Sequence, residues 1–164
     1  MKKYAYIIIC LWLFIICGFV LSQEIVLRTG KEVLLKTIPV DPRDLLRGDY
    51  VILNYEIAQI PRGKDIGYNK TVYVNLYTDS NNIAHVKSIT GLKPSEGLYL
   101  KGKTGRCNTS IPLFKSGKCV NFGIESYFVK EGTGRKLEDD LRDGALVRVV
   151  IDKYGRSKVK GFIK

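Results

Sequence analysis

His85 is the one histidine in the chain, and a Ser-His-Asp triad would have to use it. It falls in residues 83–89, which alternation of apolar and polar residues predicts as a strand, and no nucleophile motif lies near it. With one histidine and four cysteines, the chain has too few ligands for a histidine-rich metal site. We therefore expect no catalytic residue, no metal and no cofactor.

Polar residues within apolar segments are better candidates for a binding site. In residues 49–60 the buried face is predicted to carry Val51, Leu53, Tyr55 and Ile57. Tyr50 falls on the opposite face, where an aromatic ring suits a contact surface.

A second polar pair, Glu125 and Ser126, lies between apolar Ile124 and Tyr127. If this pair met Asp49 in space, the three would form a small-ligand or partner site. A structural role for all of them is the alternative, because Asp49 also suits a hydrogen bond to the backbone or to an arginine.

Two cysteines, Cys107 and Cys119, stand 12 positions apart between segments that resemble strands. They lack a second pair or a nearby histidine for zinc, so a disulfide that closes a hairpin or loop is expected. Such a bond indicates an oxidising compartment.

The N-terminal segment predicts where the chain resides. Lys2 and Lys3 precede 18 uncharged residues, Tyr4 to Leu21, which as a helix span about 27 Å of a hydrocarbon core of roughly 30 Å. The two lysines favour a cytoplasmic N-terminus in the cell membrane. We expect an anchor over residues 1–22 and an extracytoplasmic domain over residues 23–164. A signal peptide cleaved near Ser22 is the alternative.

The chain has 27 Lys and Arg residues against 16 Asp and Glu, a net charge of +11. Basic residues are spread singly rather than in an arm, so nucleic-acid binding is not expected. In an extracytoplasmic domain the charge favours contact with anionic lipid or the envelope surface, or serves solubility.

The remaining pattern predicts mainly short strands. Residues 24–38 are predicted as a hairpin around Thr29-Gly30, and residues 40–48 and 135–143 as two short helices. Further strands are expected at residues 49–60, 71–78, 83–89, 98–102, 120–129, 146–152 and 158–163. This order predicts an antiparallel β barrel or sandwich-like domain after one transmembrane helix.

Residues 48–55, GDYVILNY, with the preceding DPRDLLR, resemble the signature of the GDYXXLXY family, and 122–134 and 149–162 resemble its C-terminal half. The resemblance implies small bacterial proteins with one N-terminal membrane segment, an exported domain of unassigned function, and frequent association with polytopic membrane proteins. It brings no catalytic residues. We therefore expect a non-enzymatic accessory or binding module for an integral membrane protein.

A membrane-anchored signal peptidase is the alternative from the enzyme class. The order Pro42, Gly48-Asp49 and Lys87 loosely resembles that family. Where that family places its serine, this chain has Ile38 to Asp41, so no hydroxyl nucleophile is available for a Ser-Lys pair. Under this alternative, the protein is an inactive relative of the Ser/Lys signal peptidases.

Overall fold

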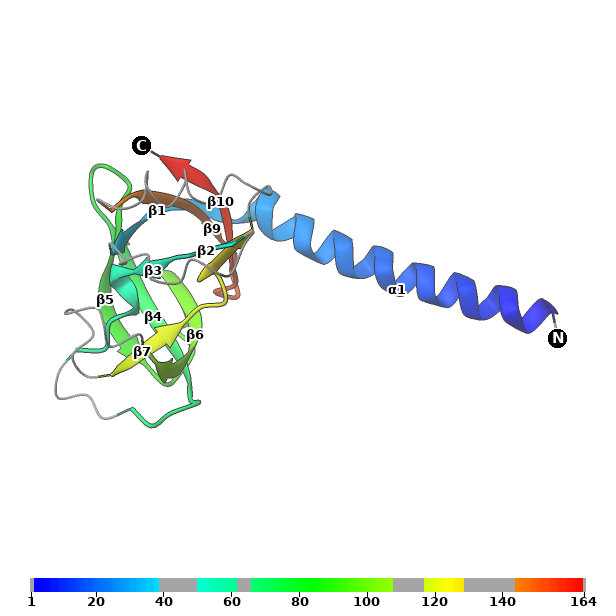
Figure 1. Cartoon of the computed structure of the whole chain (residues 1–164), viewed down its shortest axis with the longest axis horizontal. Coiled ribbons are helices and arrows are strands. Elements are labelled where there is room, and N and C mark those ends of the chain that lie inside the picture. The colour runs from blue at the N-terminus through cyan, green and yellow to red at the C-terminus, as the bar shows by residue number, and fades with distance from the viewer. Residues whose placement is uncertain (1, 39–49, 62–65, 108–116, 129–143, 164) are drawn as a thin grey trace.

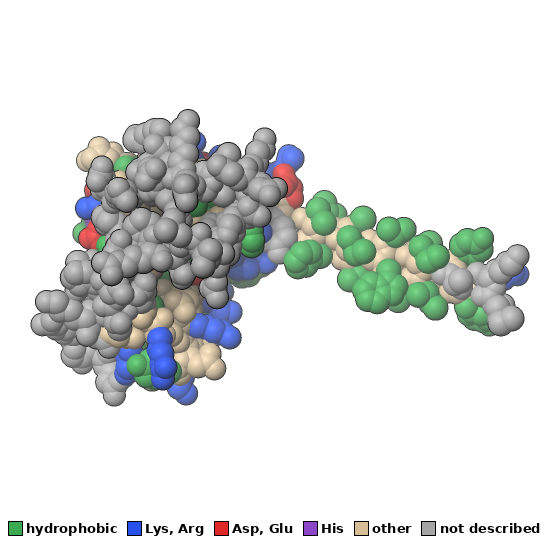
Figure 2. Space-filling view, in the orientation of Figure 1, with side chains coloured by type: hydrophobic (Ala, Val, Ile, Leu, Met, Phe, Trp, Pro, Cys, Tyr) green, Lys and Arg blue, Asp and Glu red, His purple; other side chains and the backbone are tan. Residues whose placement is uncertain are grey.

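A long N-terminal helix joins a domain of curved β-sheets (Figure 1). The computed structural model describes residues 2–38, 50–61, 66–107, 117–128 and 144–163. Helix α1 comprises Lys2–Thr29. Its side chains from Tyr6 to Leu21 are exposed, and this part of the helix extends away from the domain (Figure 2). Its segment Tyr6–Thr29 is long and apolar enough to cross a membrane.

The predicted hairpin around Thr29-Gly30 is wrong in its first strand, because residues 24–29 continue α1. The helix ends at Thr29, and the N–H of the next residue, Gly30, donates to the carbonyl oxygen of Val26 at 3.1 Å. A Cβ at Gly30 would lie 2.7 Å from that oxygen and 2.9 Å from the carbonyl oxygen of Ile151. Glycine therefore lets the end of the helix approach the sheet.

Ten strands and one short 3-10 helix follow α1 in the described residues. They are β1 (Lys31–Ile38), β2 (Tyr50–Ile52), β3 (Asn54–Tyr55), η1 (Glu56–Ala58), β4 (Thr71–Thr78), β5 (Ala84–Thr90), β6 (Leu98–Arg106), β7 (Lys118–Asn121), β8 (Ser126–Phe128), β9 (Leu146–Ile151) and β10 (Ser157–Ile163).

The strands form three antiparallel sheets, which confirms the predicted mainly-β class. Their orders are β10-β9-β1-β3, β5-β4-β6-β7 and the two-stranded ribbon β2-β8. The sheets curl toward one another like part of a barrel (Figure 1). Hairpins β4–β5 and β9–β10 lie where alternation predicts them.

Alternation also predicts the core correctly. All four residues of the predicted face in the 49–60 segment are at most 3% exposed, with Tyr55 at 0%. From the sheet β5-β4-β6-β7, Val72, Val74 and Leu100 are at most 1% exposed and belong to the same apolar cluster. Burying this apolar surface is the main force that holds the sheets together.

Two predicted strands are each broken in the structure. Residues 50–60 bend at Leu53, so β2 pairs with β8 whereas β3 pairs with β1, and η1 follows. The predicted strand 120–129 is divided at residues 122–125 into β7 and β8, with Gly123 at a φ of 82°. In both places the chain leaves one sheet for another, which a bend permits. The two predicted helices, 40–48 and 135–143, lie outside the described residues.

One end of the first sheet adjoins α1. Lys31 pairs with Ile151, which pairs with Ser157 on its other side, so these three residues form a row beside the helix end. Val26 in the last turn of α1 is only 2% exposed, and α1 contacts β9 and β10. The β9–β10 turn, residues 152–156, starts from this row.

Candidate functional site

The ribbon β2-β8 pairs the two segments in which the sequence predicts binding residues, 50–52 and 126–128. In its register, Tyr50 stands opposite Phe128 and Ile52 opposite Ser126. The N–H of Leu53 extends the pairing by donating to the carbonyl oxygen of Glu125 at 2.7 Å. Asp49 lies outside the described residues, so its predicted meeting with Glu125 and Ser126 stays a prediction.

Tyr55 takes a structural position beneath the ribbon. Its side chain is fully buried, and its hydroxyl donates a hydrogen bond of 2.9 Å to the carbonyl oxygen of Ile124. Burial, and to a lesser degree the negative charge of Glu125, raises the pKa of this phenol well above its ordinary value. Tyr55 therefore holds the two segments together and is not exposed to a ligand.

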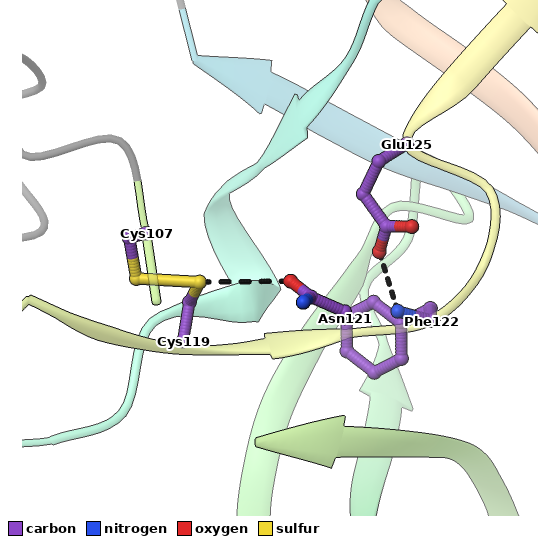
Figure 3. The surroundings of a disulfide bond; sticks show 5 residues. All are labelled: Cys107, Cys119, Asn121, Phe122 and Glu125. Atoms are coloured by element: carbon purple, nitrogen blue, oxygen red, sulfur yellow. Dashed lines mark hydrogen bonds between the residues drawn. A yellow bond between two sulfur atoms is a disulfide. The ribbon is translucent and has the colours of Figure 1, made fainter. Parts of the chain in front are cut away.

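Glu125 holds the turn between β7 and β8. Its carboxylate accepts hydrogen bonds from the backbone N–H groups of Phe122 and Gly123, the second at 2.8 Å (Figure 3). Charge-assisted bonds of this kind order a short turn. With its carboxylate so engaged, Glu125 positions Ser126, which is exposed, at the start of β8.

The outer face of the ribbon is apolar and exposed. Ile52 is 46% exposed and Phe128 is 77% exposed, while Val51 and Tyr127 on the inner face pack against the core. Tyr127 also stacks edge-on against Phe162 of β10, with ring centroids 4.8 Å apart. This contact places the ribbon beside the sheet that adjoins α1.

A small cavity adjoins the exposed serine. It has a volume of about 320 Å³ and is lined by residues from β8 and from the start of β10, among them Ser126, Phe128 and Lys158. In the lining, Ser126 and Ser157 supply hydroxyls and Lys158 a cation, on mainly apolar walls. Such a lining suits binding of an apolar or anionic group.

The predicted disulfide is present in the structure. Cys107 directly follows β6 and Cys119 lies in β7, with Cα atoms 5.4 Å apart (Figure 3). Since β6 and β7 are paired, the bond joins the two strands at the end where the chain passes from β6 to β7. Cys10 and Cys17 of α1 are free.

A cationic cluster around Tyr154 was not predicted from the sequence. Three cations lie near its ring centroid: Lys153 at 5.2 Å, Lys93 at 5.5 Å and Arg156 at 5.6 Å. Lys93 comes from the β5–β6 loop and the other two from the β9–β10 turn, so only the fold brings them together.

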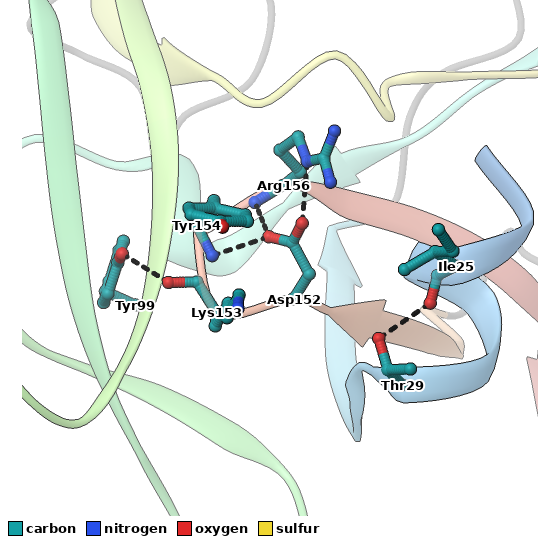
Figure 4. A network of polar contacts seen from close by, with 7 residues as sticks. All are labelled: Ile25, Thr29, Tyr99, Asp152, Lys153, Tyr154 and Arg156. Carbon is teal, nitrogen blue, oxygen red and sulfur yellow. Dashed lines mark hydrogen bonds and ion pairs between the residues drawn. The ribbon is translucent and has the colours of Figure 1, made fainter. Parts of the chain in front are cut away.

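The buried carboxylate of Asp152 shapes that turn (Figure 4). It accepts hydrogen bonds from the backbone N–H groups of Tyr154 and Arg156 at 2.9 and 2.8 Å, and pairs with the Arg156 guanidinium at 2.7 Å. The turn is fastened to β6 because the Tyr99 hydroxyl donates to the carbonyl oxygen of Lys153 at 2.8 Å. Tyr154 is thereby held on the surface.

A wider groove runs over β6 and β7. Its volume is about 650 Å³, and its lining includes Tyr68, Lys101, Lys103, Asn121 and Phe122. Gly102 leaves no room for a side chain, since a Cβ there would collide with the side chain of Val120. The groove is open and cationic.

The residues considered for catalysis have ordinary surroundings. His85 contacts the Asp79 carboxylate at 3.2 Å and stacks on Tyr77, and Lys87 is exposed on β5. Backbone hydrogen bonds, led by that from Ile83, lower the pKa of Asp79, which therefore stays ionised while it holds the β4–β5 turn. Among the described residues no three His, Cys, Asp or Glu side chains gather as a metal site.

Comparison with known proteins gives one match. No curated protein and no solved structure matches the chain. The family model of the GDYXXLXY protein matches residues 12–162, nearly the whole chain. Its signature residues 48–55 include the ribbon strand β2 and the buried Tyr55. This match shows that the chain belongs to the GDYXXLXY protein family.

Proposed function

We propose that this protein is a non-enzymatic binding module, anchored in the cell membrane by α1, whose extracytoplasmic β-domain is an accessory to a polytopic membrane protein. The observation that carries the proposal is the pair of exposed apolar side chains on the ribbon, Ile52 and Phe128. The inner face of the ribbon packs against β10, which also contacts α1. Because the ribbon lies beside the sheet that adjoins the membrane helix, we infer that a partner embedded in the same membrane can reach it.

The placement of the domain outside the cytoplasm is supported by two features. Lys2 and Lys3 precede the apolar run, which favours a cytoplasmic N-terminus. The Cys107–Cys119 disulfide suits an oxidising compartment. Retention of the anchor is tested by sequencing the N-terminus of the mature protein, and a mature N-terminus at Gln23 would refute the tether.

The accessory role is tested by photo-crosslinking in intact membranes. A photoreactive phenylalanine analogue replaces Phe128 or, as a control, Tyr77, which is 52% exposed on β4. We expect Phe128, but not Tyr77, to capture one and the same polytopic protein in repeated preparations. Recovery of lipid adducts alone, or of no adduct, contradicts the proposal.

A charge on the ribbon face is expected to remove that adduct. Ile52→Asp should lower the yield at least ~10-fold, because an aspartate would have to be desolvated in an apolar contact. Leu92→Asp is the matched control, since Leu92 is 84% exposed in the β5–β6 loop. Equal loss in both variants would mean that the ribbon is not the contact.

A further inference from the structure

Three lysines lie on the side of the domain that adjoins α1. Lys31 begins β1 directly after the helix, and its partner in the sheet, Ile151, precedes the turn that carries Lys153. Lys93 reaches the same turn, 5.5 Å from the Tyr154 ring. Figure 2 shows Lys and Arg side chains on the part of the domain that faces the helix.

These lysines carry unbalanced charge. Arg28 is paired with Glu24, and Arg156 is paired with Asp152. In contrast, the ion pairs among the described residues include none formed by Lys31, Lys93 or Lys153, and all three side chains are exposed. Glu96, in the same loop as Lys93, is the acidic residue nearest to it in the chain.

The length of α1 sets the height of this surface above the bilayer. The uncharged run ends at Leu21, and Gly30 follows nine residues later, which is about 13 Å of helix. The headgroup layer on each side of a bilayer is about 5 to 8 Å thick, by difference between the total and hydrocarbon thicknesses. Lysine side chains that extend from the domain toward the helix side can therefore reach headgroup phosphates.

Tyr154 suits the headgroup layer of the bilayer as well. Its ring is 51% exposed at the centre of the cations, and tyrosine is enriched at membrane–water interfaces because its ring is apolar and its hydroxyl polar. Asp152 keeps the turn that presents it in one conformation. The surface is thus ordered before a ligand arrives, which lowers the entropic cost of binding.

We propose that Lys93 and Lys153, which lie beside Tyr154, and Lys31, which follows the end of α1, bind the headgroups of anionic lipids in the membrane that α1 crosses, and thereby fix the orientation of the β-domain over the bilayer. This inference rests on the membrane tether of the proposed function and is independent of the protein partner. It gives the basic charge of the domain a specific location and ligand.

The test uses the full chain in nanodiscs of phosphatidylcholine containing roughly 30% phosphatidylglycerol, which gives the bilayer a negative surface potential. A photoreactive phenylalanine analogue at Tyr154 reports which lipid it touches, by mass spectrometry of the adducts. We expect phosphatidylglycerol adducts to exceed their share of the bilayer, and the excess to disappear with added salt. Adducts in proportion to bilayer composition, or none, would overturn the proposal.

The lysines are tested with a matched surface variant. Lys93→Gln combined with Lys153→Gln should reduce the preference for anionic lipid roughly 25-fold, at about 5-fold for each charge near the surface. Lys87→Gln, on β5 and away from α1 in Figure 1, should leave it unchanged. The same loss for each removed charge in Lys87→Gln and in the double variant would indicate nonspecific charge attraction and refute the site.

A second measurement leaves the side chains of the cluster intact. Amide hydrogen exchange of residues 152–156 in the wild-type chain should be at least ~3-fold slower in nanodiscs that contain phosphatidylglycerol than in nanodiscs of phosphatidylcholine alone. Exchange in β5 should be the same in both. No protection contradicts the proposal. Loss of the Phe128 protein adduct with lipid protection retained would refute the accessory role alone, so the two proposals fail separately.

Discussion

The hydroxyl of Tyr55 donates a hydrogen bond of 2.9 Å to the carbonyl oxygen of Ile124, across 69 positions of sequence. This bond joins the signature segment to the segment that enters β8, directly under the ribbon. A buried carbonyl that loses its donor costs more free energy than an average hydrogen bond contributes. The bond therefore bears on stability and on the geometry of the candidate binding face.

Tyr55→Phe removes the donor and keeps the ring. We expect the free energy of unfolding to fall by about 1 to 3 kcal/mol, measured by denaturant titration of the full chain in detergent. Tyr77→Phe, at an exposed position, should change it by less than about 0.5 kcal/mol. An unchanged midpoint in Tyr55→Phe would show that the hydroxyl contributes nothing.

Burial of the same phenol predicts an alkaline loss of stability. Its pKa in the folded protein is raised, mainly by burial, whereas in the unfolded chain it is near 10. The folded protein therefore retains a proton that the unfolded chain releases. The contribution of this phenol to stability is constant below about pH 10 and falls as the pH rises above it. Tyr55→Phe should flatten this fall, and an equally steep fall in that variant would contradict the assignment.

The Cys107–Cys119 disulfide should contribute measurably to stability. In the chain-entropy account, a loop of this size is worth about 3 kcal/mol, so replacing both cysteines by serine should lower the free energy of unfolding by that order. Replacing Cys10 and Cys17, which are free, is the control and should have little effect on the domain. Peptide mapping without reductant should recover residues 107 and 119 as one linked pair, and two free thiols there would refute the bond.

Gly30 should be intolerant of a side chain. Gly30→Ala brings a methyl group against the carbonyl oxygens of Val26 and Ile151, so the helix end must shift away from β9, at about 1 to 3 kcal/mol. Faster amide exchange in the last turn of α1 would report that shift. Gly91→Ala, with no atom within 4 Å of the added carbon, should show neither effect.

Several features follow from the sequence because they depend on local patterns. The uncharged run from Tyr4 to Leu21 predicts an apolar helix. The alternation of apolar and polar residues predicts which faces of residues 51–57 and 71–78 are buried. Cys107 and Cys119 are predictable as a pair because a short hairpin keeps them close. The signature residues 48–55 are contiguous in the chain, so they indicate the family without reference to the fold.

Other features depend on which segments meet, and alternation does not specify partners. Any strand with one apolar face can pair with several others, so the ribbon of residues 50–52 with 126–128 arises only when the whole core packs. The same packing bends the chain at Leu53 and Gly123 and continues α1 to Thr29, where the sequence alone favoured strands.

The cluster at Tyr154 is the clearest case of a site made by tertiary structure. In the sequence, Lys93 stands 60 positions before Lys153 and its neighbour Tyr154, and no local pattern indicates that the two segments meet. The β9–β10 turn fastens to β6 through Tyr99, and this contact brings the two lysines over one ring. Charge and apolar pattern along the chain thus determined that the domain is basic and follows an apolar helix, while long-range packing decided where its charge gathers.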